Sequence, residues 1–308
     1  KEKNMIYVAI TAAIIAVLYI ILLIMYSKVF VNKDKYADYM TMPPQKKQYV
    51  RYAEAVKSEY FEAAAKKFEG VFVKSYDGKK LYARFYRSDD SAPTVVLIHG
   101  YKSTGLRDLC FALNLLCKLS YNVLLIDLRG HGLSDGKTLS MGVKESRDIE
   151  KWTEFLKKRG ARKIILYGIS MGAATALMSL KRVKVDGVVA DCPFDSPFSA
   201  FEYTAKKHNA SMFRVYMLGV AAAIIGGFSI KKASSAAAVA ASDTPVLLIS
   251  GKNDSVVSPS EKDKIACRAA HCSVAVFDAG HAVSFYSDPI RYAREVTQFL
   301  CEICHERK

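Results

Sequence analysis

Six short runs of consecutive apolar residues recur along the chain from residue 94 onward. Runs as unbroken as these are typical of strands that are buried on both faces of a sheet. They occupy residues 94–98, 123–126, 163–167, 188–190, 246–250 and 274–277. The intervening segments with helical spacing are residues 108–119, 143–159, 171–181 and 260–270. This alternation predicts an α/β fold with a mostly parallel central sheet and helices on both faces.

A β-hairpin is predicted to precede these runs. The segments 71–76 and 81–86 alternate with a period of two, and Asp77-Gly78 separates them. An Asp-Gly pair between two such segments is a strong turn signal. Before the hairpin, the Lys-, Glu- and Ala-rich residues 45–69 are predicted to form an amphipathic helix that Gly70 ends.

The N-terminal segment has the length and composition of a transmembrane helix. Residues 5–26 contain no charged side chain. As a helix they extend for about 33 Å, enough to cross a hydrocarbon core of about 30 Å. A cleaved signal peptide has a shorter apolar core and ends at small residues, which do not follow here. We therefore expect a membrane anchor over residues 1–30, a helical linker over residues 31–70 and a catalytic domain over residues 71–308.

Residues 192–244 interrupt the alternation of strands and helices. They contain no strand signal, and the apolar stretch 212–230 within them is interrupted by glycines and carries Arg214 near its start. At under 20 residues it is poorly suited to span a bilayer. The interval is predicted to form a helical cap over the sheet.

Composition and charge narrow the class of protein. Apolar residues make up 51% of the 308, which excludes a disordered chain, and the formal net charge is +15. The basic residues are scattered, and no nucleic-acid-binding motif accompanies them, so a nucleic-acid partner is not expected. An anionic lipid surface beside the anchor accounts for the same charge. Lys and Arg counts around residues 5–26 and the seven cysteines, an odd number, lean towards a cytoplasmic domain on a single-pass membrane protein.

The pattern Gly-x-Ser-x-Gly occurs twice, around Ser134 and around Ser170. A nucleophilic serine on a sharp strand-to-helix turn needs a buried strand before it and a helix directly after it. Ser170 has both, because the apolar run 163–167 precedes it and a small-residue helical segment follows. Ser134 lies in a polar turn and no helix follows at once. Ser170 is therefore the predicted nucleophile.

A serine hydroxyl needs a base to take its proton and an acid to orient that base. Asp254 and His281 each lie just beyond the end of a predicted strand, and catalytic groups of parallel α/β sheets collect at that edge. The chain order Ser170, Asp254, His281 is the one expected for this arrangement. Asp191, after the run 188–190, remains a rival for the acid.

The developing oxyanion needs two backbone N–H donors, one after the nucleophile and one from a loop that follows an earlier strand. Met171 supplies the first. The second is predicted at Tyr101, which follows His99-Gly100 directly after the run 94–98, with the His99 ring in a structural role.

The motifs His-Gly-Tyr at 99–101, Asp-Leu-Arg-Gly-His-Gly-Leu-Ser at 127–134, Gly-Ile-Ser-Met-Gly-Ala at 168–173, Gly-Lys-Asn-Asp at 251–254 and Gly-His-Ala at 280–282 appear in this order. Over residues 71–305 the chain resembles the α/β-hydrolase superfamily. It is most similar to the serine aminopeptidase and monoacylglycerol-lipase-like branch, which has membrane-anchored members. The resemblance implies a Ser-His-Asp hydrolase whose variable cap selects the substrate.

Three functions remain open. The first is a membrane-anchored esterase that cleaves an ester or thioester of a small or lipid-like acyl substrate, with no metal or organic cofactor. The second is peptide-bond hydrolysis, for which Asp191, Asp195 or Glu202 would hold a substrate amine. The third is a non-catalytic interaction module on a hydrolase scaffold. The Cys-x-x-Cys-His sequence at 301–305 fits haem attachment or a metal pair in spacing, but its helical context favours simple packing of Cys301 and Cys304 on the inward face of a helix.

Overall fold

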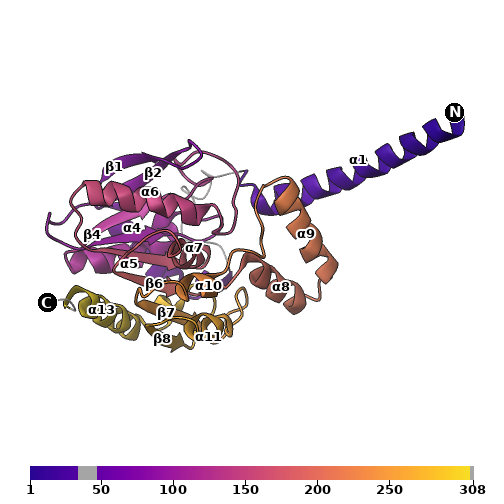
Figure 1. Cartoon of the computed structure of the whole chain (residues 1–308). Helices are drawn as coiled ribbons and strands as arrows, with labels where there is room; N and C mark the ends of the chain where they lie inside the picture. Colours follow the sequence, from indigo (N-terminus) through magenta and orange to yellow (C-terminus); the bar gives the residue numbers. More distant parts are fainter. Residues whose placement is uncertain (34–46, 306–308) are drawn as a thin grey trace.

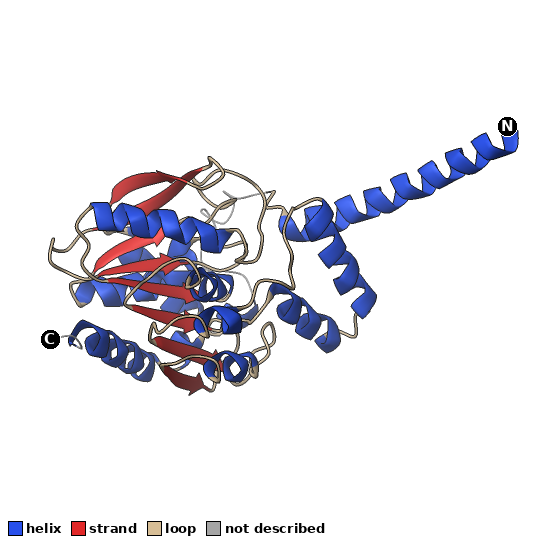
Figure 2. Ribbon diagram, in the orientation of Figure 1, coloured by secondary structure: helices blue, strands red, loops and turns tan. Residues whose placement is uncertain are grey.

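The computed structural model describes residues 1–33 and 47–305. A sheet with the strand order β1-β2-β4-β3-β5-β6-β7-β8 forms its core (Figures 1 and 2). The strands from β3 to β8 run parallel, while β2 is antiparallel to both of its neighbours. The strand bounds are Glu69–Lys74 (β1), Lys80–Tyr86 (β2), Thr94–Ile98 (β3), Asn122–Ile126 (β4), Ile164–Ile169 (β5), Gly187–Asp191 (β6), Val246–Gly251 (β7) and Cys272–Phe277 (β8).

Helices cover both faces of the sheet, as the alternating pattern predicted. One face carries α6, α7, α10 and α11, and the other carries α4, α5, α12 and α13. The helix bounds are Glu2–Phe30 (α1), Lys47–Val50 (α3), Ala53–Ala64 (α4), Gly105–Lys118 (α5), Glu145–Lys158 (α6), Met171–Ser179 (α7), Pro197–Lys207 (α8), Met212–Ile224 (α9), Ser235–Val239 (α10), Glu261–Ala266 (α11), Ser284–Ser287 (α12) and Pro289–His305 (α13).

The unbroken apolar runs follow from the position of the central strands between two helical layers. In β3, Val96 and Ile98 face one buried cluster, whereas Val95 and Leu97 face the other. Successive side chains of a strand point to opposite faces, so a strand covered on both faces needs apolar residues at every position. The prediction of an α/β fold with a mostly parallel sheet and helices on both faces is therefore confirmed.

The structure corrects the prediction for the segment before the hairpin. Residues 45 and 46 lie outside the described part. The helix predicted over residues 45–69 is instead two helices, α3 and α4, and it ends at Ala64. Gly70 does not end it, because Glu69 and Gly70 already pair with Phe85 and Arg84 in the sheet. The predicted hairpin is present as β1 and β2, with Gly78 at φ +85° in the connecting turn.

Two predictions near the C-terminus also need correction. Strand β8 lies at the edge of the sheet, so Val274 is exposed rather than buried on both faces. In α13 the inward stripe runs through Tyr292, Val296 and Leu300. Cys301 therefore falls on the exposed side, and the prediction that it packs inward is wrong, while Cys304 is half-buried beside the Tyr121 hydroxyl at 3.5 Å.

Helices α8 and α9 follow β6 in the chain and precede β7, and they lie away from the sheet (Figure 1). The third helix of the predicted cap interval, α10, packs on α7 and belongs to the layer on the sheet. Helix α9 packs against α1, which projects from the molecule beside it. Among the described residues, α1 is the one helix long and apolar enough to cross a membrane, and its place near the N-terminus also fits a signal sequence.

Candidate active site

Ser170 lies in the sharp turn between β5 and α7. Its backbone adopts φ +55° and ψ −117°, a conformation that a non-glycine residue keeps only where the surrounding structure enforces it. The Ser170 N–H donates to the Asp191 carbonyl on β6 at 2.8 Å, and the Ser170 carbonyl accepts from the Ala174 N–H at 3.0 Å. These bonds hold the hydroxyl above the end of the strand.

The two glycines around Ser170 allow this turn to lie against its neighbours. A Cβ atom on Gly172 would lie 2.0 Å from the Ile98 carbonyl oxygen on β3. A Cβ atom on Gly168 would lie 2.3 Å from the Gly172 carbonyl group. Both distances are too short for any side chain, so the Gly-x-Ser-x-Gly spacing reflects close approach of α7 to the sheet.

The structure brings the three predicted side chains together. His281 Nε2 lies 2.8 Å from Ser170 Oγ, and His281 Nδ1 lies 2.7 Å from Asp254 Oδ2. The second Asp254 oxygen, Oδ1, accepts from the Val256 and Val257 N–H groups at 2.8 and 2.9 Å. Asp254 and His281 are both buried. A carboxylate fixed in this way can orient the imidazole and stabilise its protonated form.

Asp191, the rival acid, is not part of this chain of hydrogen bonds. Its Oδ2 accepts from the Tyr292 hydroxyl at 2.9 Å, and that hydroxyl also contacts the Tyr167 hydroxyl. Among the described residues its Oδ1 has no hydrogen-bond partner. Burial raises the pKa of Asp191 to about 7. Its carboxyl is engaged with a tyrosine, so the geometry favours Asp254 as the partner of His281.

The loop after β3 presents one free backbone donor beside Ser170. The Gly100 N–H donates to Asp108 Oδ2 at 2.9 Å, and the Lys102 N–H donates to His131 Nε2 at 3.2 Å. The Tyr101 N–H between them has no partner within the part of the chain that the structure describes. A Cβ atom built on Gly100 would lie 3.6 Å from Ser170 Cβ, which places the loop against the serine.

The other predicted donor, Met171, is the first residue of α7. The first N–H groups of a helix have no partner within the helix, and the helix dipole adds positive potential at that end. The Met171 and Tyr101 N–H groups are therefore both available to an anionic oxygen.

The sequence did not predict several residues that hold the loops of the site in place. The Tyr203 hydroxyl on α8 donates to the Asp254 carbonyl at 3.0 Å, which joins the cap to the acid. Asp108 and His131 hold the loop that carries Tyr101. No periodicity or motif marks Tyr203, because its contact joins segments about 50 residues apart in the chain.

The remaining candidates have structural roles. Ser134 is buried, and its hydroxyl donates to the Asp127 carbonyl at 2.6 Å. Asp195 Oδ1 accepts from the Ala236 N–H at the start of α10, and Glu202 pairs with Lys206. The contacts of these side chains are with residues other than Ser170 and His281.

One group of potential metal ligands lies at the site. Among the described residues, Cys192, Asp254 and His281 form a group whose potential ligand atoms lie within 4.8 Å of one another. Both nitrogens of His281 are already directed at Asp254 and Ser170. Burial raises the pKa of the Cys192 thiol well above its ordinary value, which disfavours the thiolate that a metal needs. The set therefore suits proton transfer better than metal coordination.

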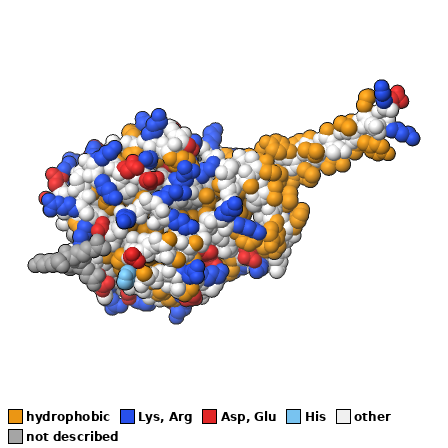
Figure 3. Space-filling view, in the orientation of Figure 1, with side chains coloured by type: hydrophobic (Ala, Val, Ile, Leu, Met, Phe, Trp, Pro, Cys, Tyr) orange, Lys and Arg blue, Asp and Glu red, His pale blue; other side chains and the backbone are white. Residues whose placement is uncertain are grey.

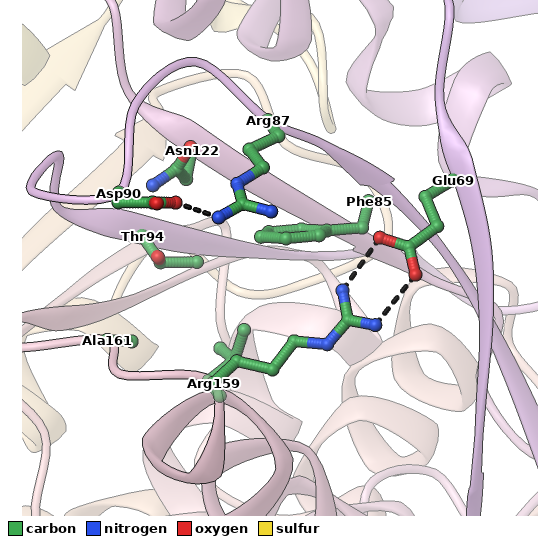
Figure 4. Close-up of a pocket in the computed structure, with 9 residues that line it drawn as sticks. Glu69, Phe85, Arg87, Asp90, Thr94, Asn122, Arg159 and Ala161 are labelled. Carbon is green, nitrogen blue, oxygen red and sulfur yellow. Dashed lines mark hydrogen bonds and ion pairs between the residues drawn. The ribbon is translucent and has the colours of Figure 1, made fainter.

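A cavity of about 310 Å³ lies at the end of the strands opposite to Ser170 (Figure 4). Thr94 and Asn122, the first residues of β3 and β4, line it. Its two guanidinium groups are engaged, because Arg87 pairs with Asp90 and Arg159 pairs with Glu69. Both pairs are solvent-exposed and lie at the end of the sheet remote from Ser170.

Known proteins with similar sequences and structures agree with this fold. The Danio rerio lysophosphatidylserine lipase ABHD12 is 28% identical over 181 residues, which cover 57% of this chain and 46% of that protein. The Pyrococcus furiosus esterase Pf2001 superposes with a TM-score of 0.65 at 24% identity, over 79% of this chain and 93% of that chain. The uncharacterized protein YqkD of Bacillus subtilis is 30% identical over 221 residues, 68% of this chain and 72% of that protein. The alpha/beta hydrolase family model matches residues 95–295, and the chain belongs to this family.

Proposed function

We propose that the protein is a membrane-anchored serine hydrolase that cleaves carboxylic ester or thioester bonds through an acyl intermediate on Ser170. The observation that carries the proposal is the continuous chain of hydrogen bonds from Ser170 Oγ through His281 to Asp254, at 2.8 and 2.7 Å. A hydroxyl is a weak nucleophile until a neighbouring base removes its proton, and the His281 imidazole is placed to do so.

In the first half of the reaction, Ser170 Oγ bonds to the acyl carbon while its proton moves to His281 Nε2. The carbonyl oxygen becomes an oxyanion that the Tyr101 and Met171 N–H groups stabilise. The C–O or C–S bond then breaks, and His281 returns the proton to the leaving alcohol or thiol. In the second half, water gives a proton to His281 and attacks the acyl carbon. The acid is released as the proton returns to Ser170.

An exposed apolar surface supports a membrane-bound location and a lipophilic substrate. Side chains over most of the length of α1 are exposed, and they are apolar. Helix α9 adds Phe213, Tyr216, Val220 and Ile224, which lie on one exposed side of the helix. Figure 3 shows that the hydrophobic surface of α1 continues onto the adjacent cap. A substrate with a long acyl group would therefore reach Ser170 from the bilayer side.

The peptidase alternative has less support. A site for a substrate amine needs a free carboxylate near Ser170. Asp191 is engaged by Tyr292, Asp195 caps α10, and Glu202 pairs with Lys206. The named activity of ABHD12, a lipase, also favours an ester substrate.

The test is labelling and hydrolysis by the full chain in detergent. A fluorophosphonate probe should label the native chain, and Ser170→Ala should abolish both labelling and hydrolysis of p-nitrophenyl esters. Asp254→Asn should lower kcat by roughly 10²- to 10⁴-fold because the imidazole loses its orienting acid. The matched variant Asp191→Asn should stay within about ten-fold of the native rate.

Three results would contradict the proposal. A folded Ser170→Ala chain that still hydrolyses esters would exclude Ser170. Equal losses in both aspartate variants would exclude Asp254 as the specific partner of His281. Faster turnover of aminoacyl p-nitroanilides than of any ester would favour the peptidase.

A further inference from the structure

The C-terminal end of α1 is capped by the hydrolase domain. The last carbonyl groups of a helix have no partner within the helix. Here the Lys28 carbonyl accepts from Lys102 Nζ at 3.0 Å, and the Val29 carbonyl accepts from the Tyr101 hydroxyl at 2.5 Å. The Phe30 carbonyl accepts from the Leu139 N–H at 2.8 Å. Consecutive carbonyls of α1 thus have hydrogen-bond donors in the domain.

Side chains and the following residues fix the same end of α1. Phe30 is fully buried, and its ring packs edge-on against Phe228 at 5.2 Å. Asn32 Nδ2 donates to the Gly130 carbonyl at 3.0 Å, and the Asn32 N–H donates to the Lys137 carbonyl at 2.8 Å. Helix α1 is therefore joined to the domain through a packed, hydrogen-bonded contact and is not a loose tether.

Two of the groups that cap α1 belong to the loop that carries the predicted oxyanion donor. The Tyr101 hydroxyl donates to α1, and the Tyr101 N–H is the predicted oxyanion donor of a loop that lies against Ser170. The next residue, Lys102, has φ +48°, a conformation that needs support from its surroundings. Burial raises the pKa of the Tyr101 hydroxyl to about 12, so it keeps its proton and remains a donor.

The loop is held from two directions. On the inner side, Asp108 accepts from the Gly100 N–H and His131 accepts from the Lys102 N–H. On the outer side, the Val29 carbonyl accepts from the Tyr101 hydroxyl, and the Lys28 carbonyl accepts from Lys102. The inner contacts fix the neighbours of Tyr101, and the outer contact fixes Tyr101 itself.

We infer that the last turn of α1 positions the oxyanion donor of Tyr101, through the bond between the Tyr101 hydroxyl and the Val29 carbonyl. The anchor then contributes to the rate of the chemical step as well as to location. The Tyr101 side chain acts as a positioning residue, distinct from the N–H group that meets the substrate. This inference rests on the proposed serine hydrolase function.

The experiment compares the full native chain with Tyr101→Phe and Phe30→Ala in detergent, using a short, soluble p-nitrophenyl ester. Rates are normalised to the fraction of chains that a fluorophosphonate titrates. Tyr101→Phe removes only the hydroxyl, and Phe30→Ala loosens the end of α1 without touching the loop. Each should lower kcat roughly ten-fold with an unchanged KM, because a small displacement of a donor weakens transition-state binding alone.

A transition-state analogue and a control variant separate positioning from general damage. The affinity for a trifluoromethyl ketone, which forms an oxyanion on Ser170, should fall by the same factor as kcat. Tyr121→Phe also removes a tyrosine hydroxyl, one that contacts Cys304 far from Ser170, and it should leave both values unchanged. The double variant Tyr101→Phe/Phe30→Ala should lose no more than the larger single loss, because both changes break one contact.

The results that would overturn the inference are distinct from those that would overturn the function. An active native chain with an unchanged kcat in Tyr101→Phe excludes positioning by this contact. A change in KM alone, or in the titratable fraction alone, also excludes it. Losses of kcat that multiply in the double variant would exclude it as well. A native chain that neither labels nor hydrolyses the ester would instead remove the proposed function, and the inference with it.

Discussion

At the scale of single residues, the two aspartates at the site differ in what surrounds them. Asp254 has hydrogen-bond partners for both oxygens, from His281 and from two backbone N–H groups. Asp191 has one partner, Tyr292, and its other oxygen is buried without one among the described residues. Burial of this carboxyl, with one oxygen unpaired, disfavours its charged form and raises the pKa of Asp191 to about 7.

The raised pKa of Asp191 predicts how stability depends on pH. An aspartate in an unfolded chain ionises near pH 4, whereas burial raises the pKa of Asp191 to about 7 in the folded protein. From about pH 4 to pH 7 the folded state therefore binds more protons at this group than the unfolded state. Its contribution to the free energy of unfolding falls as the pH rises through that window.

Asp191→Asn removes this dependence, because the amide is neutral at every pH and its oxygen can still accept from Tyr292. The melting temperature of Asp191→Asn, relative to the native chain, should rise from pH 4.5 to pH 7.5. The corresponding difference in free energy should be on the order of 1–3 kcal/mol. Melting curves in detergent at several pH values measure it. Parallel curves for the two chains would show that Asp191 is ionised throughout.

At the scale of elements, the turn between β5 and α7 depends on contact between backbones. Gly172 lies so close to β3 that a methyl group would overlap the Ile98 carbonyl. Gly172→Ala should therefore displace α7, lower the melting temperature by several degrees and reduce kcat by more than roughly 100-fold. Circular dichroism melts and ester hydrolysis measure the two effects.

Gly219 provides the matched control, because it also lies in a helix, α9. A Cβ atom there would meet Ile230 at 3.4 Å, an ordinary contact distance. Gly219→Ala should leave both activity and melting temperature near the native values, or raise the latter slightly. Similar effects at the two glycines would mean that helix propensity, rather than close approach, explains the motif.

The elements that the sequence predicted best are those whose local pattern and tertiary position agree. The runs that became β3 to β7 are apolar at consecutive positions because helices cover both of their faces. The pattern predicted the strand β8 but not its exposed position at the edge of the sheet. It also extended the helix of residues 45–69 too far, because Glu69 and Gly70 pair in the sheet. Such outcomes depend on neighbours that are distant in the chain.

The contrast between local sequence pattern and contacts of distant segments also applies to the site. The proximity of Ser170, Asp254 and His281 was predictable because each follows a strand and parallel strands end at one edge. The contacts of Tyr203 with the acid loop and of Tyr101 with α1 join segments about 50 and 70 residues apart. They follow from how the cap and the N-terminal helix lie on the domain, and no local pattern in the sequence encodes that arrangement.

At the scale of the whole molecule, α1 and α9 form one apolar surface. Leu22 and Tyr26, at the end of the predicted span over residues 5–26, belong to the same buried cluster as Leu218 and Ala222 of α9. Helix α9 therefore lies at the level where α1 would leave the bilayer. Its opposite side exposes apolar side chains, Phe213 and Tyr216 among them. A helix in this position that exposes apolar side chains should lie in the membrane interface.

Basic residues beside α9 agree with that placement. Lys231 Nζ lies 4.5 Å from the centroid of the Tyr216 ring, and Arg214 and Lys207 lie nearby in sequence. Each Lys or Arg near an anionic lipid surface contributes about 1 kcal/mol of attraction. The exposed apolar side of α9 would then face lipid.

Tryptophan fluorescence can test this placement directly, because the native chain has a single tryptophan, Trp152, and it is buried in the hydrolase domain. Tyr216→Trp places a second indole on the exposed side of α9, and Phe72→Trp places one on β1, far from α1. In proteoliposomes with lipids brominated on their acyl chains, the emission that Tyr216→Trp adds should be quenched by more than about half, because an interfacial helix buries its apolar side about 5–10 Å deep. The Phe72→Trp signal should match that in unbrominated lipid once the native emission is subtracted. Equal emission from Tyr216→Trp in both lipids would mean that the cap stands clear of the bilayer, and substrates would then have to reach Ser170 from solution.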